Sequence, residues 1–71
     1  MKVIAIIYKG LKSTPEVTIE MVLDCVPRKG DDIYFNDNYE IDGDLYVDRV
    51  EWCLDKSIVP HVNLIIRELD E

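Results

Sequence analysis

A near-regular alternation of apolar and polar side chains over residues 16–25 constrains this fold more than any other feature. Polar side chains fill most of the intervening positions, and only Val22 breaks the pattern. Successive side chains of a β-strand point to opposite faces of a sheet, so a period of two predicts a half-buried strand. The apolar members of this strand are expected to face a core: Val17, Ile19, Met21, Leu23 and Cys25.

Residues 2–8 predict a second strand, because this short run is rich in β-branched side chains. The run is apolar on both parities, so we expect both of its faces to be covered. Later in the chain, Ile33 and Phe35 are expected to face inward on a further strand. The apolar parity then switches near Asp48 and Arg49, which predicts either a β-bulge or a sharp bend of the barrel.

Turn-forming residues separate these strands. Pro27 removes a backbone donor and Gly30 allows a positive φ, so a turn is expected between them. Asp42-Gly43 is a hairpin signal, and Pro60 is expected to open the last strand. No segment has a helical period. The 71 residues therefore predict one domain, 1–71, of the all-β class: a small five- to six-stranded barrel.

The charge of the chain is unevenly distributed. The formal net charge is −7, and residues 31–55 hold nine acids against Arg49 alone. Such a field repels phosphate, so direct nucleic-acid binding is not expected. It suits a basic protein partner or serves solubility alone. The candidate acidic interaction surface consists of Asp37, Glu40, Asp42, Asp44 and Asp48.

Catalytic and metal chemistry find little support in the sequence. The spacing Asn38-x-Glu40-x-Asp42 resembles a calcium loop, but Arg49 stands where a bidentate glutamate is needed. His61 is the single histidine and lacks a partner at a motif spacing. We therefore expect no metal, no cofactor and no enzymatic activity, and no room for a buried pocket of ordinary ligand size. The single tryptophan, Trp52, is expected to lie in the core.

Cysteine content and hydropathy bear on location. Two cysteines, Cys25 and Cys53, are expected to be reduced and packed. No apolar run approaches the length of a membrane-spanning helix, and no secretory signal is expected. A cytoplasmic protein without membrane contact is the expectation.

Three segments together resemble a known architecture. They are Val26-Pro27-x-x-Gly30-Asp31-x-Ile33, Tyr46-x-x-x-Val50-x-Trp52 and Pro60-His61-Val62-x-Leu64. This arrangement resembles SH3-like β-barrels, and more narrowly short barrel proteins encoded in bacterial and phage genomes. The resemblance covers most of the chain, implies a barrel with a phage association, and carries no activity with it.

The functional expectation is a non-enzymatic protein–protein interaction module, with a homodimer as one form of it. Apolar residues on the outer parity exceed what a lone small barrel should expose to water. They form the candidate apolar interface: Ile4, Ile6, Tyr8, Ile65 and Leu69. The alternative is an acidic decoy that imitates a phosphate backbone and inhibits a basic nucleic-acid-binding protein.

Overall fold

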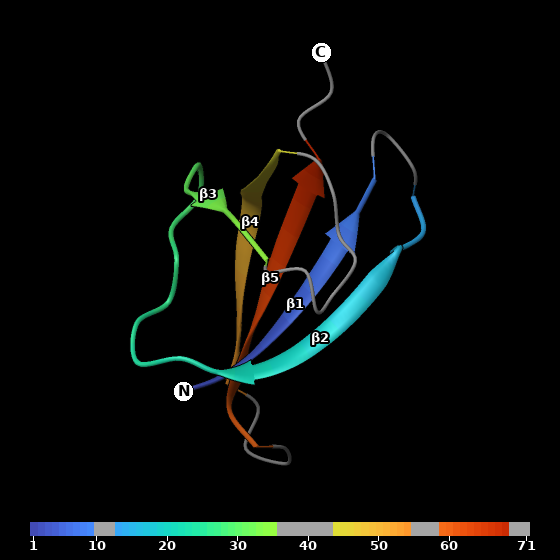
Figure 1. The fold of residues 1–71 in the computed structure, drawn as a ribbon. Coiled ribbons are helices and arrows are strands. Elements are labelled where there is room, and N and C mark those ends of the chain that lie inside the picture. The colour runs from blue at the N-terminus through green and yellow to red at the C-terminus, as the bar shows by residue number, and fades with distance from the viewer. Residues whose placement is uncertain (10–12, 36–43, 55–58, 69–71) are drawn as a thin grey trace.

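The computed structural model describes residues 1–9, 13–35, 44–54 and 59–68. Within these ranges the chain forms five strands and no helix (Figure 1). Their bounds are β1 Lys2–Tyr8, β2 Val17–Val22, β3 Asp32–Ile33, β4 Leu45–Cys53 and β5 His61–Glu68. The all-β expectation is therefore confirmed.

The five strands form one sheet in the order β2-β1-β5-β4-β3. β1 pairs antiparallel with β2 and parallel with β5, and β4 pairs antiparallel with both β5 and β3. The sheet curls into a half-barrel (Figure 1), as expected of a small barrel. β2 and β3 are the end strands of the described sheet.

The core lies on the inner, concave face of this half-barrel. Odd positions of β1 and β2 and even positions of β5 point inward, as the alternation predicts. The cluster consists of Val3, Ala5, Ile7, Ile19, Leu45, Val47, Val62, Leu64 and Ile66. Half-buried apolar side chains, among them Ile33 and Phe35, pack against it, which confirms their predicted inward orientation.

Of the two features predicted near Asp48 and Arg49, a bulge or a sharp bend, the structure has a bulge in β4. The register with β5 shifts between Val47 and Arg49, so Asp48 has no paired residue there. Leu45 and Val47 contribute to the core before the bulge, and Val50 packs against it afterwards. The inward-facing positions of β4 are therefore odd before the bulge and even after it, because the bulge inserts one unpaired residue into the strand.

The segment Leu23–Phe35 crosses the concave face (Figure 1). It is held to β4 at its turn, where the Gly30 N–H donates to the Val47 carbonyl at 2.8 Å and the Val47 N–H donates to the Asp31 carbonyl at 2.9 Å. The Arg28 N–H donates to Asp31 Oδ2 at 2.8 Å. Gly30 has φ +94°, so the turn predicted from Pro27 and Gly30 is confirmed.

Two predicted core positions are wrong. Trp52 is 55% exposed, because it is the last but one residue of β4 and lies near the end of the sheet, where the half-barrel offers only partial cover. Cys25 is also exposed. β2 ends at Val22, so the alternation no longer fixes the direction of the Cys25 side chain. Both cysteines are free thiols, as predicted.

Candidate functional site

The outer, convex face brings most of the candidate apolar interface together. The register places Ile6 of β1 beside Ile65 of β5, and Ile65 beside Arg49 of β4. Ile4, Ile6 and Tyr8 are half-buried, whereas Ile65 is only 6% exposed. Ile65 therefore adds little open surface. Leu69 lies outside the described residues.

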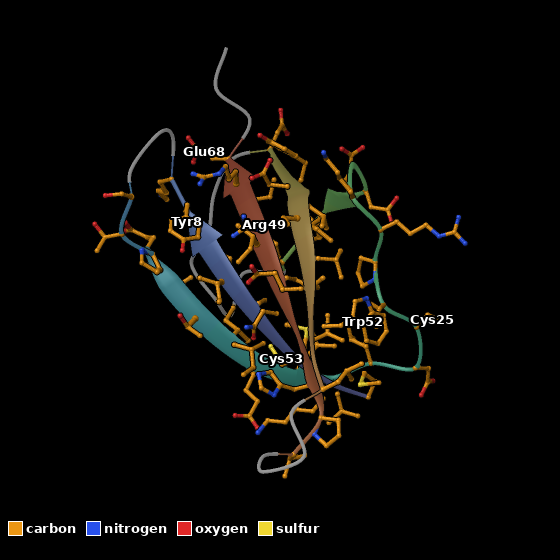
Figure 2. All side chains as sticks on the ribbon, turned by 180° about the vertical axis from the view of Figure 1, so that it is seen from behind. Tyr8, Cys25, Arg49, Trp52, Cys53 and Glu68 are labelled. Atoms are coloured by element: carbon orange, nitrogen blue, oxygen red, sulfur yellow. The ribbon has the colours of Figure 1, made fainter. Side chains whose placement is uncertain are left out.

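Charged side chains surround this apolar strip. The Arg67 guanidinium lies 4.8 Å from the centre of the Tyr8 ring, and its Nε donates to Asp48 Oδ2 at 3.2 Å. On the neighbouring strand, Arg49 pairs with Glu51 at 3.2 Å. Figure 2 shows Tyr8 and Arg49 on this side of the sheet. The strip is thus narrow and has a polar margin.

Replacing Arg67 with lysine is expected to lower the free energy of unfolding by about 1 kcal/mol. Lysine keeps the charge but loses the planar group that both stacks on Tyr8 and bonds Asp48. The companion change Asp48→Asn should cost only about 0.5 kcal/mol, because the pair is partly exposed. Urea denaturation at low and high salt measures both changes. Equal stability of Arg67→Lys and the parent would contradict the stacking role.

The acidic candidates are only partly placed by the structure. Asp37, Glu40 and Asp42 lie outside the described residues. Asp44 is exposed just before β4. Asp48 lies in the bulge and its carboxylate is engaged by Arg67. The structure therefore does not gather these five side chains into one described surface.

A second apolar surface lies at one end of the sheet, and sequence reasoning missed it. Met1, Trp52 and Leu54 are 48%, 55% and 67% exposed. Trp52 pairs with Val62, which pairs with Val3 on its other side. We call Met1, Trp52 and Leu54 the end patch. Figure 1 shows the N-terminus at the same end as the start of β5, and Figure 2 shows Trp52 on the side of β4 nearer to Cys25.

Met1 is held in position at this end. Its amino group donates to the Leu23 carbonyl at 3.1 Å, and the Leu23 N–H donates to the Met1 carbonyl at 2.9 Å. These bonds extend the β1–β2 pairing by one row. The backbone of Met1 is therefore held against the backbone of Leu23. The parity of β4 predicts the face of Trp52, but it does not predict how far the cover over that face extends.

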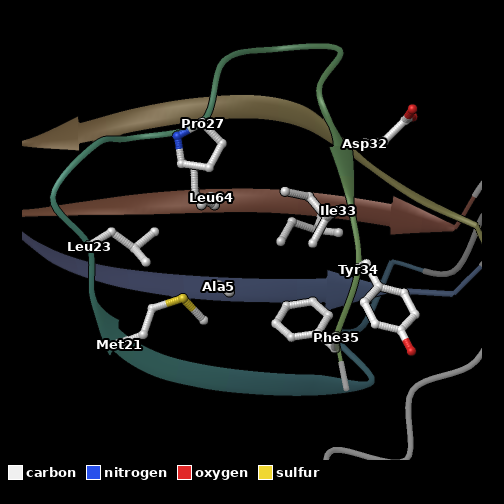
Figure 3. A pocket seen from close by; sticks show the side chains of 10 residues that line it. Ala5, Met21, Leu23, Pro27, Asp32, Ile33, Tyr34, Phe35 and Leu64 are labelled. Atoms are coloured by element: carbon white, nitrogen blue, oxygen red, sulfur yellow. The ribbon is translucent and has the colours of Figure 1, made fainter. Parts of the chain in front are cut away.

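A hollow of about 330 Å³ lies under the crossing segment. Ala5, Leu64 and Ile66 of the sheet line it, together with Met21 of β2 and residues of Leu23–Phe35. We call it the framed pocket, because β2 and the crossing segment enclose it on several sides (Figure 3). The sequence-based expectation excluded only a buried pocket of ordinary ligand size, whereas this hollow is partly open, and no expectation foresaw it. The path of the crossing segment, not a residue motif, creates the space.

The walls of the framed pocket are apolar. Leu23, Pro27, Ile33 and Phe35 border the hollow, whereas Asp32 and Tyr34 point outward from its rim (Figure 3). Tyr34 is 87% exposed. No motif predicts this pocket, but one signal was present. Ala5 is the smallest side chain in an otherwise bulky apolar run, and it leaves space at the floor.

Reactive groups in the described part of the chain are scattered. No three His, Cys, Asp or Glu side chains among those residues form a group that could hold a metal ion. His61 Nδ1 lies 3.0 Å from the Val59 carbonyl oxygen, and the Asn63 amide donates to Cys53 Sγ at 3.4 Å. A search of the described residues found no helix long and apolar enough to cross a membrane.

Comparison with protein-family models, with curated proteins and with solved structures finds no match for this chain. The fold and its surfaces are therefore the basis for any functional proposal.

Proposed function

We propose that the protein is a non-enzymatic protein–protein interaction module that acts through apolar surface on its half-barrel. The observation that carries this proposal is the end patch, where Trp52 and Leu54 are more than half exposed at the same end of the sheet as Met1. Tryptophan is enriched among the residues that dominate binding energy in protein interfaces. An exposed tryptophan adjoining apolar neighbours favours a partner that covers it.

A second copy of the chain is the first partner to test. The half-buried strip of Ile4 and Ile6 adds apolar surface on the opposite face, so two distinct surfaces support the interaction role. We also propose an SH3-like relationship, a phage association and a cytoplasmic location for the protein. The acidic decoy is the alternative, and the net charge of −7 is the feature that favours it.

The test uses the single tryptophan as its own reporter. If the end patch is an interface, the Trp52 emission should move to shorter wavelength as protein concentration or partner is raised, because its ring leaves water. Light scattering measures the mass in parallel. The double variant Trp52→Ser, Leu54→Ser should weaken association at least about tenfold, since each exposed anchor contributes more than about 1 kcal/mol.

The matched control is Tyr34→Ser, which removes another exposed aromatic residue away from the end patch. It should leave association unchanged. A chain that stays monomeric at high concentration and keeps its Trp52 emission in the presence of candidate partners would contradict the proposal. Capture of only basic partners, abolished by moderate salt and indifferent to Trp52→Ser, would favour the decoy instead.

A further inference from the structure

We propose that the framed pocket binds a small organic cation with an apolar body, of the aryl-alkyl amine kind. This site is separate from the end patch, and the proposal does not depend on the interaction role. The first observation that supports this proposal is the volume of the framed pocket. A hollow of about 330 Å³ falls at the lower end of small-molecule sites, which span roughly 300–1,000 Å³. That space suits a bicyclic aromatic ring or a short branched chain.

The lining determines the body of the ligand. The floor is made by Ala5 and Leu64, and the walls include Met21, Leu23 and Phe35. Such walls offer no strong hydrogen-bond partner to water, so an apolar guest gains free energy by leaving solvent. The described residues contain no buried side-chain nitrogen or oxygen without a partner. Among the described residues that line the pocket, only Asp32 and Tyr34 have polar side chains, and both point outward from the rim (Figure 3).

The rim determines the head of the ligand. Asp32 is the only charged side chain among the described residues that line the pocket. It is exposed, and its carboxylate points away from the hollow, outside the rim (Figure 3). Its neighbour Asp31 is occupied with the Arg28 backbone. The whole chain carries −7, so the surrounding field favours a cation over an anion. A ligand with its ring inside and its ammonium group outside matches both features.

Three probes that share one ring and differ in head charge test this proposal: tryptamine, 3-methylindole and indole-3-propionate. Each is titrated into the full chain while NMR follows the methyl signals of Ala5, Leu64 and Ile66. All three signals should shift. Tryptamine should bind about three- to fivefold tighter than 3-methylindole, the size expected for one ion pair near water. Indole-3-propionate should bind most weakly.

Two variants distinguish the contribution of the ligand's apolar ring to binding from that of its ammonium group. Ala5→Leu fills the floor of the hollow and should weaken all three probes at least about tenfold. Ala5→Val is the milder filling variant if leucine impairs folding. Asp32→Asn should leave 3-methylindole unchanged and remove the advantage of tryptamine. Ile6→Leu, on the opposite face of the same strand, is the control and should bind as the parent does.

Contrary results are equally definite. Absence of shifts at millimolar probe with a folded chain overturns the proposal, as does equal affinity for all three head groups. If only a lysine-flanked peptide with a tryptophan moves these signals, the pocket docks a partner and is not a small-molecule site. Light scattering and Trp52 emission report on the interaction role independently, so failure of one proposal is distinguishable from failure of the other.

Discussion

Replacing Ile7 with alanine is expected to lower the free energy of unfolding by about 3 to 4 kcal/mol. Ile7 is fully buried and lies between Val17 of β2 and Ile66 of β5. Removing three carbon atoms there loses apolar burial and leaves a cavity that the strands on both sides hold open. For a domain of this size, such a loss is a large fraction of the total stability.

The matched control for Ile7 is its neighbour Ile6. Ile6→Ala removes the same atoms from the same strand, but from a half-buried position on the convex face. It should cost only about 1 kcal/mol, in proportion to the smaller area that it buries. Urea denaturation followed by circular dichroism measures both variants. Equal losses for the two alanines would show that the inward parity assigned to β1 is wrong.

The inward and outward faces could be predicted from the sequence because a strand has a fixed period. Alternation in β2 identified Ile19 and Met21 as inward-facing, and the change of parity near Asp48 located the bulge. Each of these inferences uses only neighbours in the chain. The direction of each of these side chains is therefore set by the local geometry of its strand and does not depend on the rest of the fold.

The exposure of individual side chains could not be predicted in the same way, because it depends on which other segments cover them. Parity assigns Trp52 a face, but its exposure depends on where the sheet and the crossing segment end in space. Cys25 continues the alternation in sequence, yet β2 ends three residues earlier. The parallel pairing of β1 with β5 likewise depends on contacts between segments about 60 positions apart. No local pattern encodes that choice.

The candidate sites also differ in whether they depend on local strand parity or on the long-range arrangement of the chain. Ile4, Ile6 and Ile65 were placed together because the outer parity of two strands is a local property. The framed pocket was missed because its walls come from the route of Leu23–Phe35 over the sheet. That route is fixed by the bonds of the Gly30 turn to Val47. The turn, which the residue pattern predicts, therefore helps to set the shape of the framed pocket, which the residue pattern does not predict.

Gly30→Ala is expected to lower the free energy of unfolding by about 1 to 2 kcal/mol. The φ of Gly30 is +94°, a conformation that a residue with a Cβ adopts at a cost. A Cβ built at this position meets no atom within 4 Å, so the loss comes from the backbone and not from a clash. Gly30→Asn should cost less, because asparagine tolerates positive φ better than alanine.

Hydrogen exchange locates the effect of the Gly30 change. If alanine forces the turn to relax, the bonds that join residues 30 and 31 to Val47 should open more often. The amides of residue 30 and Val47 should then exchange faster in Gly30→Ala than in Gly30→Asn, while Val3 and Leu64 in the sheet keep their protection. Unchanged stability and exchange in the alanine variant would mean that the positive φ does not hold this turn in place. The crossing segment would then owe its path to Ile33 and Phe35 packing on the core.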